Sequence, residues 1–89
     1  MRAKKIDLNQ PEIVEGLRAM GASVTSLAPI GAGCPDLLVG WKGRNLLMEV
    51  KQEQETFTAP QKLWHKHWQG SAHVVRSIAE AIQVLGSYR

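Results

Sequence analysis

The sequence has few cysteines, few aromatic residues and no long apolar run, and two of these shortages exclude a class of protein. The single cysteine among 89 residues cannot form an internal disulfide, so we expect a protein of the reducing cytosol. No apolar run approaches the roughly 20 residues of a membrane-spanning helix. The first residues are polar, so we expect no secretory signal. A net charge of +3 is compatible with a nucleic-acid partner but does not indicate one by itself.

The composition that is present is that of an ordinary globular domain. Apolar residues make up 44% of the chain and charged residues 21%, which argues against a disordered segment. The sequence contains no internal repeat, and no linker divides it. We therefore expect one domain over residues 1–89.

Apolar periodicity and turn signals predict seven elements in the order α-β-β-β-α-β-α, a mixed β-sheet flanked by helices. The predicted ranges are a helix at 9–20, strands at 22–28, 36–41 and 44–51, a helix from 58 to about 70, a strand at 73–76 and a helix from 77 to 86. The strands at 36–41 and 44–51 carry apolar residues on both faces, so we expect them to be buried inside the sheet. Asn9 with Glu12 and Thr58 with Gln61 have the spacing of capping boxes, and Leu8 is placed to pack on Ile13.

The turn between the second and third predicted strands determines which residues face each other. If Lys42 and Gly43 form a two-residue turn, opposed residue numbers sum to 85, and Asp36 lies opposite Glu49. Opposed residues project from one face with Cβ atoms roughly 4.5–5.5 Å apart. Lys51 lies two residues beyond Glu49 and therefore shares that face.

Two carboxylates and an amine on one sheet face suit metal-assisted hydrolysis of a phosphodiester. Asp36 and Glu49 could share one divalent cation with water completing its shell, as Mg²⁺ prefers. Lys51 could orient or deprotonate a water, or stabilise the developing charge. The alternative is a strand-ending Asp36 and a solvated Glu49–Lys51 pair. Burial within an apolar strand argues against this alternative, because an unpaired buried charge is costly.

The segment Cys34-Pro35-Asp36, then twelve intervening residues and Glu49-Val50-Lys51, resembles the PD-(D/E)xK nuclease motif. The wider pattern resembles the virus-type replication-repair nuclease (VRR-NUC) family over nearly the whole chain. The resemblance is carried by residues 9–14 (NQPEIV), 31–40 (GAGCPDLLVG) and 49–51 (EVK), and by Gln61 with Trp64 and Trp68.

The resemblance implies a restriction-endonuclease-like fold that cleaves DNA with Mg²⁺ or Mn²⁺. It implies that Asp36, Glu49 and the Val50 carbonyl are metal ligands and that Lys51 is the catalytic lysine. Glu12 would approach the metal directly or through water, and Gln61 would support the site as part of the catalytic group. Small stand-alone members occur in phages and prophages, are associated with Holliday-junction resolution, and resemble archaeal resolvases that act as homodimers.

Some of these residues have a second explanation. Capping boxes already account for Glu12 and Gln61, and Trp64 with Trp68 are better explained by a core or dimer interface than by base stacking. The cations that could contact DNA phosphates could equally serve solubility. These cations are Arg2, Lys4, Lys5, Lys42 and Arg44.

The sequence therefore predicts a metal-dependent endonuclease for branched DNA, acting as a homodimer. A flap or general structure-specific nuclease is an alternative, as is a non-catalytic DNA-binding module of the same fold. The residues alone do not distinguish DNA from RNA.

Overall fold

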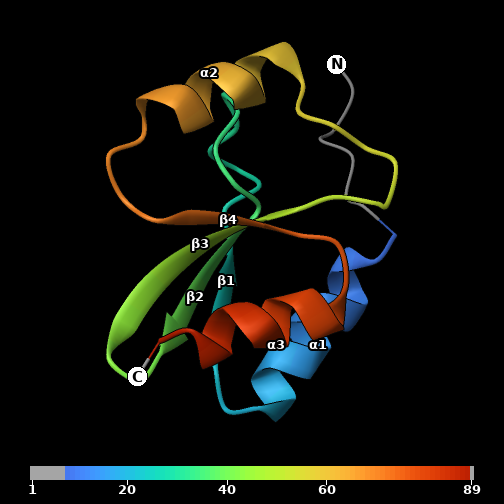
Figure 1. Cartoon of the computed structure of the whole chain (residues 1–89), viewed down its shortest axis with the longest axis vertical. Coiled ribbons are helices and arrows are strands. Elements are labelled where there is room, and N and C mark those ends of the chain that lie inside the picture. The colour runs from blue at the N-terminus through green and yellow to red at the C-terminus, as the bar shows by residue number, and fades with distance from the viewer. Residues whose placement is uncertain (1–7, 89) are drawn as a thin grey trace.

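The computed structural model describes residues 8–88 and has the predicted order of elements, shown in Figure 1. The elements are α1 (Gln10–Ala19), β1 (Ser23–Ser26), β2 (Leu37–Trp41), β3 (Arg44–Val50), α2 (Ala59–His67), β4 (Ala72–Val75) and α3 (Ile78–Gly86). Within this range no helix is long and apolar enough to cross a membrane.

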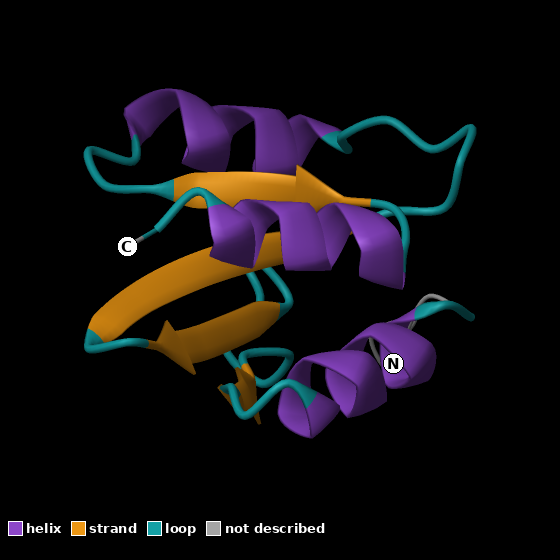
Figure 2. Cartoon of the chain, turned by 60° about the horizontal axis from the view of Figure 1, so that its bottom comes forward, coloured by secondary structure: helices purple, strands orange, loops and turns teal. Residues whose placement is uncertain are grey.

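The four strands form one mixed sheet in the order β1-β2-β3-β4. β1, β2 and β3 pair antiparallel, whereas β3 and β4 pair parallel because α2 makes the crossover between them. Helices α1 and α3 lie on one face of this sheet and α2 lies on the other (Figures 1 and 2). The fold is therefore the expected mixed sheet flanked by helices.

The apolar core lies between the sheet and the pair α1 and α3. It contains Ile13, Leu17, Ala22, Val24, Leu37, Val39, Leu46, Met48, Val50, Val75, Ala81 and Leu85. The opposite sheet face is covered less completely, since α2 has no buried residue and Leu38 on β2 is 36% exposed. The prediction that both strands are buried on both faces is therefore wrong for the face toward α2, because one short helix covers it only in part.

The predicted turn and register of the β2–β3 hairpin are confirmed. Lys42 and Gly43 both have positive φ, 49° and 77°, as a type I′ turn requires. Trp41 pairs with Arg44, and Leu37 pairs with Met48, so opposed numbers sum to 85 along the ladder. Asp36 therefore lies one position before Leu37, the first paired residue of β2.

The two predicted capping boxes have different outcomes. Thr58 and Gln61 form theirs at the start of α2, whereas the Asn9 side chain makes no cap hydrogen bond at α1. The expected packing of Leu8 on Ile13 is also wrong, because Leu8 is 85% exposed and Ile13 is buried. Asn9 has another partner, since its Nδ2 donates to the carbonyls of Lys51 at 3.1 Å and Arg76 at 2.9 Å. It thereby joins the ends of β3 and β4.

Candidate active site

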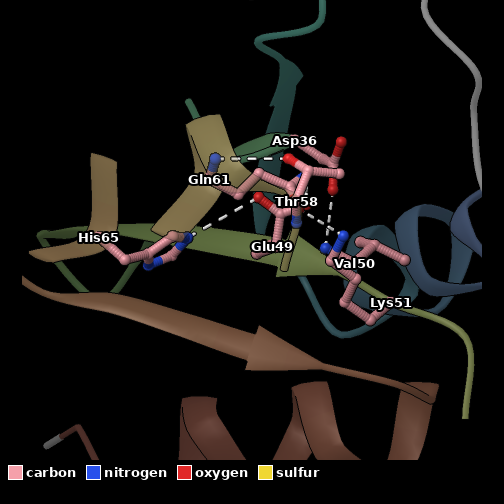
Figure 3. Close-up of polar contacts among 7 residues, drawn as sticks. All are labelled: Asp36, Glu49, Val50, Lys51, Thr58, Gln61 and His65. Atoms are coloured by element: carbon pink, nitrogen blue, oxygen red, sulfur yellow. Dashed lines mark hydrogen bonds and ion pairs between the residues drawn. The ribbon is translucent and has the colours of Figure 1, made fainter. Parts of the chain in front are cut away.

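Three charged side chains come together at the open end of the β2–β3 hairpin, opposite its turn: Asp36, Glu49 and Lys51 (Figure 3). Their relative exposures are 6%, 1% and 4%, which is rare for charged side chains. The Val50 N–H donates to Asp36 Oδ2 at 2.8 Å, so Asp36 is tied to the residue beside Glu49. The hairpin register thus explains how two carboxylates separated by twelve intervening residues meet.

Gln61 on α2 connects the amine and one carboxylate of this cluster. Its Oε1 accepts from Lys51 Nζ at 2.6 Å and from the Thr58 N–H at 2.9 Å, while its Nε2 donates to Glu49 Oε2 at 3.3 Å. The same amide therefore caps α2 and orients Lys51 and Glu49. The predicted cap is thus confirmed, and the same side chain contacts the residues that Gln61 is predicted to support.

The loop before Asp36 sets how closely α2 approaches the sheet. Gly33 has a φ of +81°, and a Cβ there would lie 2.3 Å from the Pro60 carbonyl oxygen and 2.9 Å from the Gln61 nitrogen. Only glycine combines this conformation with such an approach. The glycine of the Gly-Cys-Pro-Asp segment thereby allows the first turn of α2 to bring Gln61 to the carboxylates.

The loop that follows Lys51 is held by Arg76. Its Nη1 donates to the carbonyls of Gln52 at 2.5 Å, Glu55 at 2.9 Å and Glu53 at 3.3 Å. Three carbonyls on one guanidinium fix the path of the chain between β3 and α2. The Arg76 contacts and the hydrogen bond from Asn9 to the Lys51 carbonyl together anchor the backbone at Lys51.

Two residues that the sequence analysis did not select, His65 and Phe57, border the cluster. His65 Nε2 lies 3.8 Å from Glu49 Oε1. Its ring stacks on Phe57 with a centroid separation of 4.3 Å, and the Phe57 ring centre lies 6.0 Å from Lys51 Nζ. Burial, and secondarily the charge of Lys51, lower the pKa of His65. The four-residue spacing from Gln61 on one helix face was the available signal for His65.

Comparison with known proteins finds one solved structure similar to this chain. No protein-family model and no curated protein matches the sequence. A solved structure described as a VRR_NUC domain matches with a TM-score of 0.71 and 27% sequence identity, over 90% of this chain and 92% of that chain. This similarity supports the VRR-NUC family for the chain. The family predicted from the Pro-Asp and Glu-Val-Lys segments is thus confirmed.

Glu12 is not one of the buried charged residues of the cluster. It is exposed on α1 and borders a surface depression formed with Leu8, Pro11, Glu15, Gly16, Ala19 and Ile78. Neither Asp36 nor Glu49 borders that depression. Because Asn9 does not cap α1, the capping-box explanation of Glu12 is wrong, and its role near the metal stays a prediction.

Two of the expected phosphate contacts are described by the structure, and both lie away from the site. Lys42 and Arg44 are at the hairpin turn, five or more strand residues from Glu49, which corresponds to about 17 Å. Lys42 lies over the Trp41 ring, and Arg44 lies over the Tyr88 ring. The other three predicted contacts, Arg2, Lys4 and Lys5, lie outside the described residues.

The donor set of the cluster fits a hard divalent cation. Among residues 8–88, no three His, Cys, Asp or Glu side chains form a metal-binding group. The carboxylates of Asp36 and Glu49 are nevertheless neighbours through Val50. Mg²⁺ commonly binds one or two carboxylates and keeps its remaining positions for water and substrate phosphate. Asp36 and Glu49 would therefore suffice as its side-chain ligands, with the Val50 carbonyl as a backbone oxygen.

Proposed function

We propose that this VRR-NUC domain is a Mg²⁺- or Mn²⁺-dependent endonuclease that hydrolyses phosphodiester bonds in branched DNA. The observation that carries the proposal is the burial of Asp36, Glu49 and Lys51 in one cluster organised by Gln61. Burying charged groups is costly, and such clusters are typical of functional sites. A solvated surface pair would not be buried, so that alternative loses its support.

The side chains of the cluster divide the work of hydrolysis. Asp36, Glu49 and the Val50 carbonyl would hold the cation, which supplies Lewis-acid stabilisation of the phosphoryl oxygens and makes water more acidic. Lys51, oriented by the 2.6 Å contact with Gln61, is the group to orient or deprotonate the attacking water or to stabilise the developing negative charge. Gln61 is the residue that holds Lys51 and Glu49 in their relative orientation.

A homodimer that resolves four-way junctions is the specific form that we propose. Symmetric cuts across a junction need two active sites. An apolar groove of about 590 Å³ lies between the loop after β1, the sheet and α2, and Leu38, Trp64 and Trp68 border it. Trp68 is 46% exposed and stacks on Trp64 at 4.6 Å. A second copy of the chain is the partner proposed for this surface, as aromatic residues are enriched at such interfaces.

Two other functions remain alternatives. The same cluster would serve a flap or general structure-specific nuclease, because nothing in the cluster depends on the branch geometry. A non-catalytic DNA-binding module of this fold would need no buried lysine held beside two carboxylates, and the intact Asp36, Glu49 and Lys51 therefore favour catalysis.

The test is cleavage of a labelled immobile four-way junction, a 5′ flap and a linear duplex by the purified chain. Each reaction is run with Mg²⁺, with Mn²⁺ and with EDTA, and is repeated with Asp36→Asn. We expect metal-dependent paired nicks in the junction, and none with the variant. Sedimentation of the same samples measures whether the active species is a dimer.

The outcomes separate the alternatives. Cleavage of the flap alone would keep the nuclease and reject the resolvase. Tight junction binding with no cleavage of any substrate would favour the non-catalytic module. Cleavage by Asp36→Asn at the rate of the unmodified chain would remove Asp36 from the metal site.

A further inference from the structure

One helix face of α2 points two side chains at one carboxylate. Gln61 and His65 are four residues apart, so they lie one above the other on the side of α2 that faces the sheet. Gln61 Nε2 donates to Glu49 Oε2 at 3.3 Å, and His65 Nε2 lies 3.8 Å from Glu49 Oε1 (Figure 3). Each oxygen of Glu49 thus has a different nitrogen of α2 beside it.

The imidazole of His65 is held in place by aromatic neighbours. It stacks on Phe57 with an interplanar angle of 15°, and Trp64 meets its edge at a centroid separation of 5.1 Å. The side chain is 14% exposed. These contacts fix the ring and leave Nε2 directed toward Glu49, as Figure 3 shows.

The contact between His65 and Glu49 is longer than a hydrogen bond. Among residues 8–88, Nε2 of His65 is buried and has no hydrogen-bond partner. A buried polar atom left in this state is unfavourable for folding, and such atoms are an indication of function. Shortening the 3.8 Å separation by about 0.6 Å would give an ordinary N–H···O bond of ~3.2 Å.

We propose that His65 is a positioning residue for Glu49: its Nε2–H donates to Oε1 when Glu49 binds the divalent cation. The inference rests on the proposed function, because it assumes that Glu49 is a ligand. With Gln61 on Oε2 and His65 on Oε1, the carboxylate cannot rotate, and its remaining lone pairs keep one direction for the cation. Partners of this kind typically change metal affinity by about 10–100-fold.

Binding of Mn²⁺ alone to the full chain, measured by calorimetry without DNA, tests the proposal. His65→Phe keeps a ring that can stack on Phe57 and removes the donor, whereas His65→Gln keeps an amide donor at similar reach and removes the ring. His67→Phe is the matched control, because His67 is on the same helix, is exposed and has no contact with Glu49. The melting temperature of each metal-free protein is measured in parallel.

We expect His65→Phe to weaken Mn²⁺ binding about tenfold or more, consistent with loss of a positioning partner. His65→Gln should recover most of that loss, and His67→Phe should bind as the unmodified chain does. The metal-free melting temperature of His65→Phe should not fall, since its stacking is kept. A purely structural role predicts the reverse order, with His65→Gln impaired and His65→Phe intact.

Unchanged Mn²⁺ affinity in His65→Phe would overturn the proposal, as would a His65→Gln variant that binds no better than His65→Phe. If His65→Phe does not fold, His65→Leu takes its place in the comparison. Asp36→Asn distinguishes failure of the metal site from failure of the role of His65 alone. If the unmodified chain binds Mn²⁺ no better than Asp36→Asn, the metal site of the proposed function fails, and the role of His65 fails with it.

Discussion

Gly33→Ala tests whether the position of α2 on the sheet controls activity. The added Cβ would lie 2.3 Å from the Pro60 carbonyl oxygen, whereas the shortest ordinary carbon–oxygen contacts are about 3.3 Å. The first turn of α2 must therefore move by about 1 Å, the difference between these two distances. The 3.3 Å bond from Gln61 to Glu49 would lengthen to about 4.3 Å and be lost.

The stability cost has two parts that a control variant separates. An alanine at positive φ destabilises the folded state by roughly 1–2 kcal/mol. About 0.4–1 kcal/mol of this loss is offset, because alanine lowers the conformational entropy of the unfolded chain. Gly31→Ala carries this cost alone, because Gly31 also has positive φ, +66°, and a Cβ there meets nothing within 4 Å. Gly33→Ala adds overpacking of about 1–3 kcal/mol.

The assays are urea unfolding and cleavage of the junction at a temperature at which both variants are folded. We expect Gly31→Ala to lose about 1 kcal/mol and keep its cleavage rate. Gly33→Ala should lose about 2 kcal/mol more and cleave on the order of 10²-fold more slowly, as displacements of ~1 Å at active sites can do. If the two variants match in both stability and rate, the reasoning about α2 is refuted.

Four further predictions address single residues. Lys51→Ala should lower the cleavage rate by at least about 10²-fold while Mn²⁺ affinity changes little; an equal loss of both would make Lys51 a part of metal binding. Glu12→Gln should alter neither cleavage nor melting temperature, because Glu12 is exposed and α1 has no side-chain cap; a large loss of cleavage would support its predicted role near the metal. Asn9→Ala removes two hydrogen bonds to the Lys51 and Arg76 carbonyls and should cost about 2 kcal/mol in urea unfolding, whereas a cost near zero would show that the strand ends need no such tie. Burial lowers the pKa of His73, whose Nε2 lies 2.7 Å from the Tyr88 hydroxyl, so the unfolded chain binds the proton first as pH falls below about 6.5. The free energy of unfolding should therefore be lower at about pH 5.5 than at about pH 7.5, by a smaller amount in His73→Gln; equal pH dependence in both proteins would contradict this assignment.

The hairpin could be predicted from sequence because its determinants are local. The Lys42–Gly43 turn fixes the register, and the period of two then places Asp36, Glu49 and Lys51 on one face. The family followed from the same short segments. Spacing alone was sufficient for this part of the site, since every step connects residues of two adjacent strands.

Contacts between distant segments were not predictable in this way. The spacing of Asn9 and Glu12 indicated a local cap, but the Asn9 amide reaches the ends of β3 and β4, 42 and 67 residues away. His65 carried only a helical spacing from Gln61, and its approach to Glu49 depends on how α2 sits on the sheet. That placement is set by Gly33 and Pro60, a contact between a loop and the first turn of α2 that no periodicity reports.

The site and the placement of α2 depend on each other. None of the residues of α2 is buried, so apolar burial alone does not hold this helix on the sheet. Its attachments include the polar contacts of Gln61, the contacts of His65 with Glu49 and Phe57, the close approach at Gly33, and the partly exposed Trp64 and Trp68. In the proposed homodimer, a second copy seated on the apolar groove would bury those tryptophans and stabilise α2 in place. Dimer formation would then also fix Gln61 on Lys51 and Glu49, because one short helix carries both surfaces.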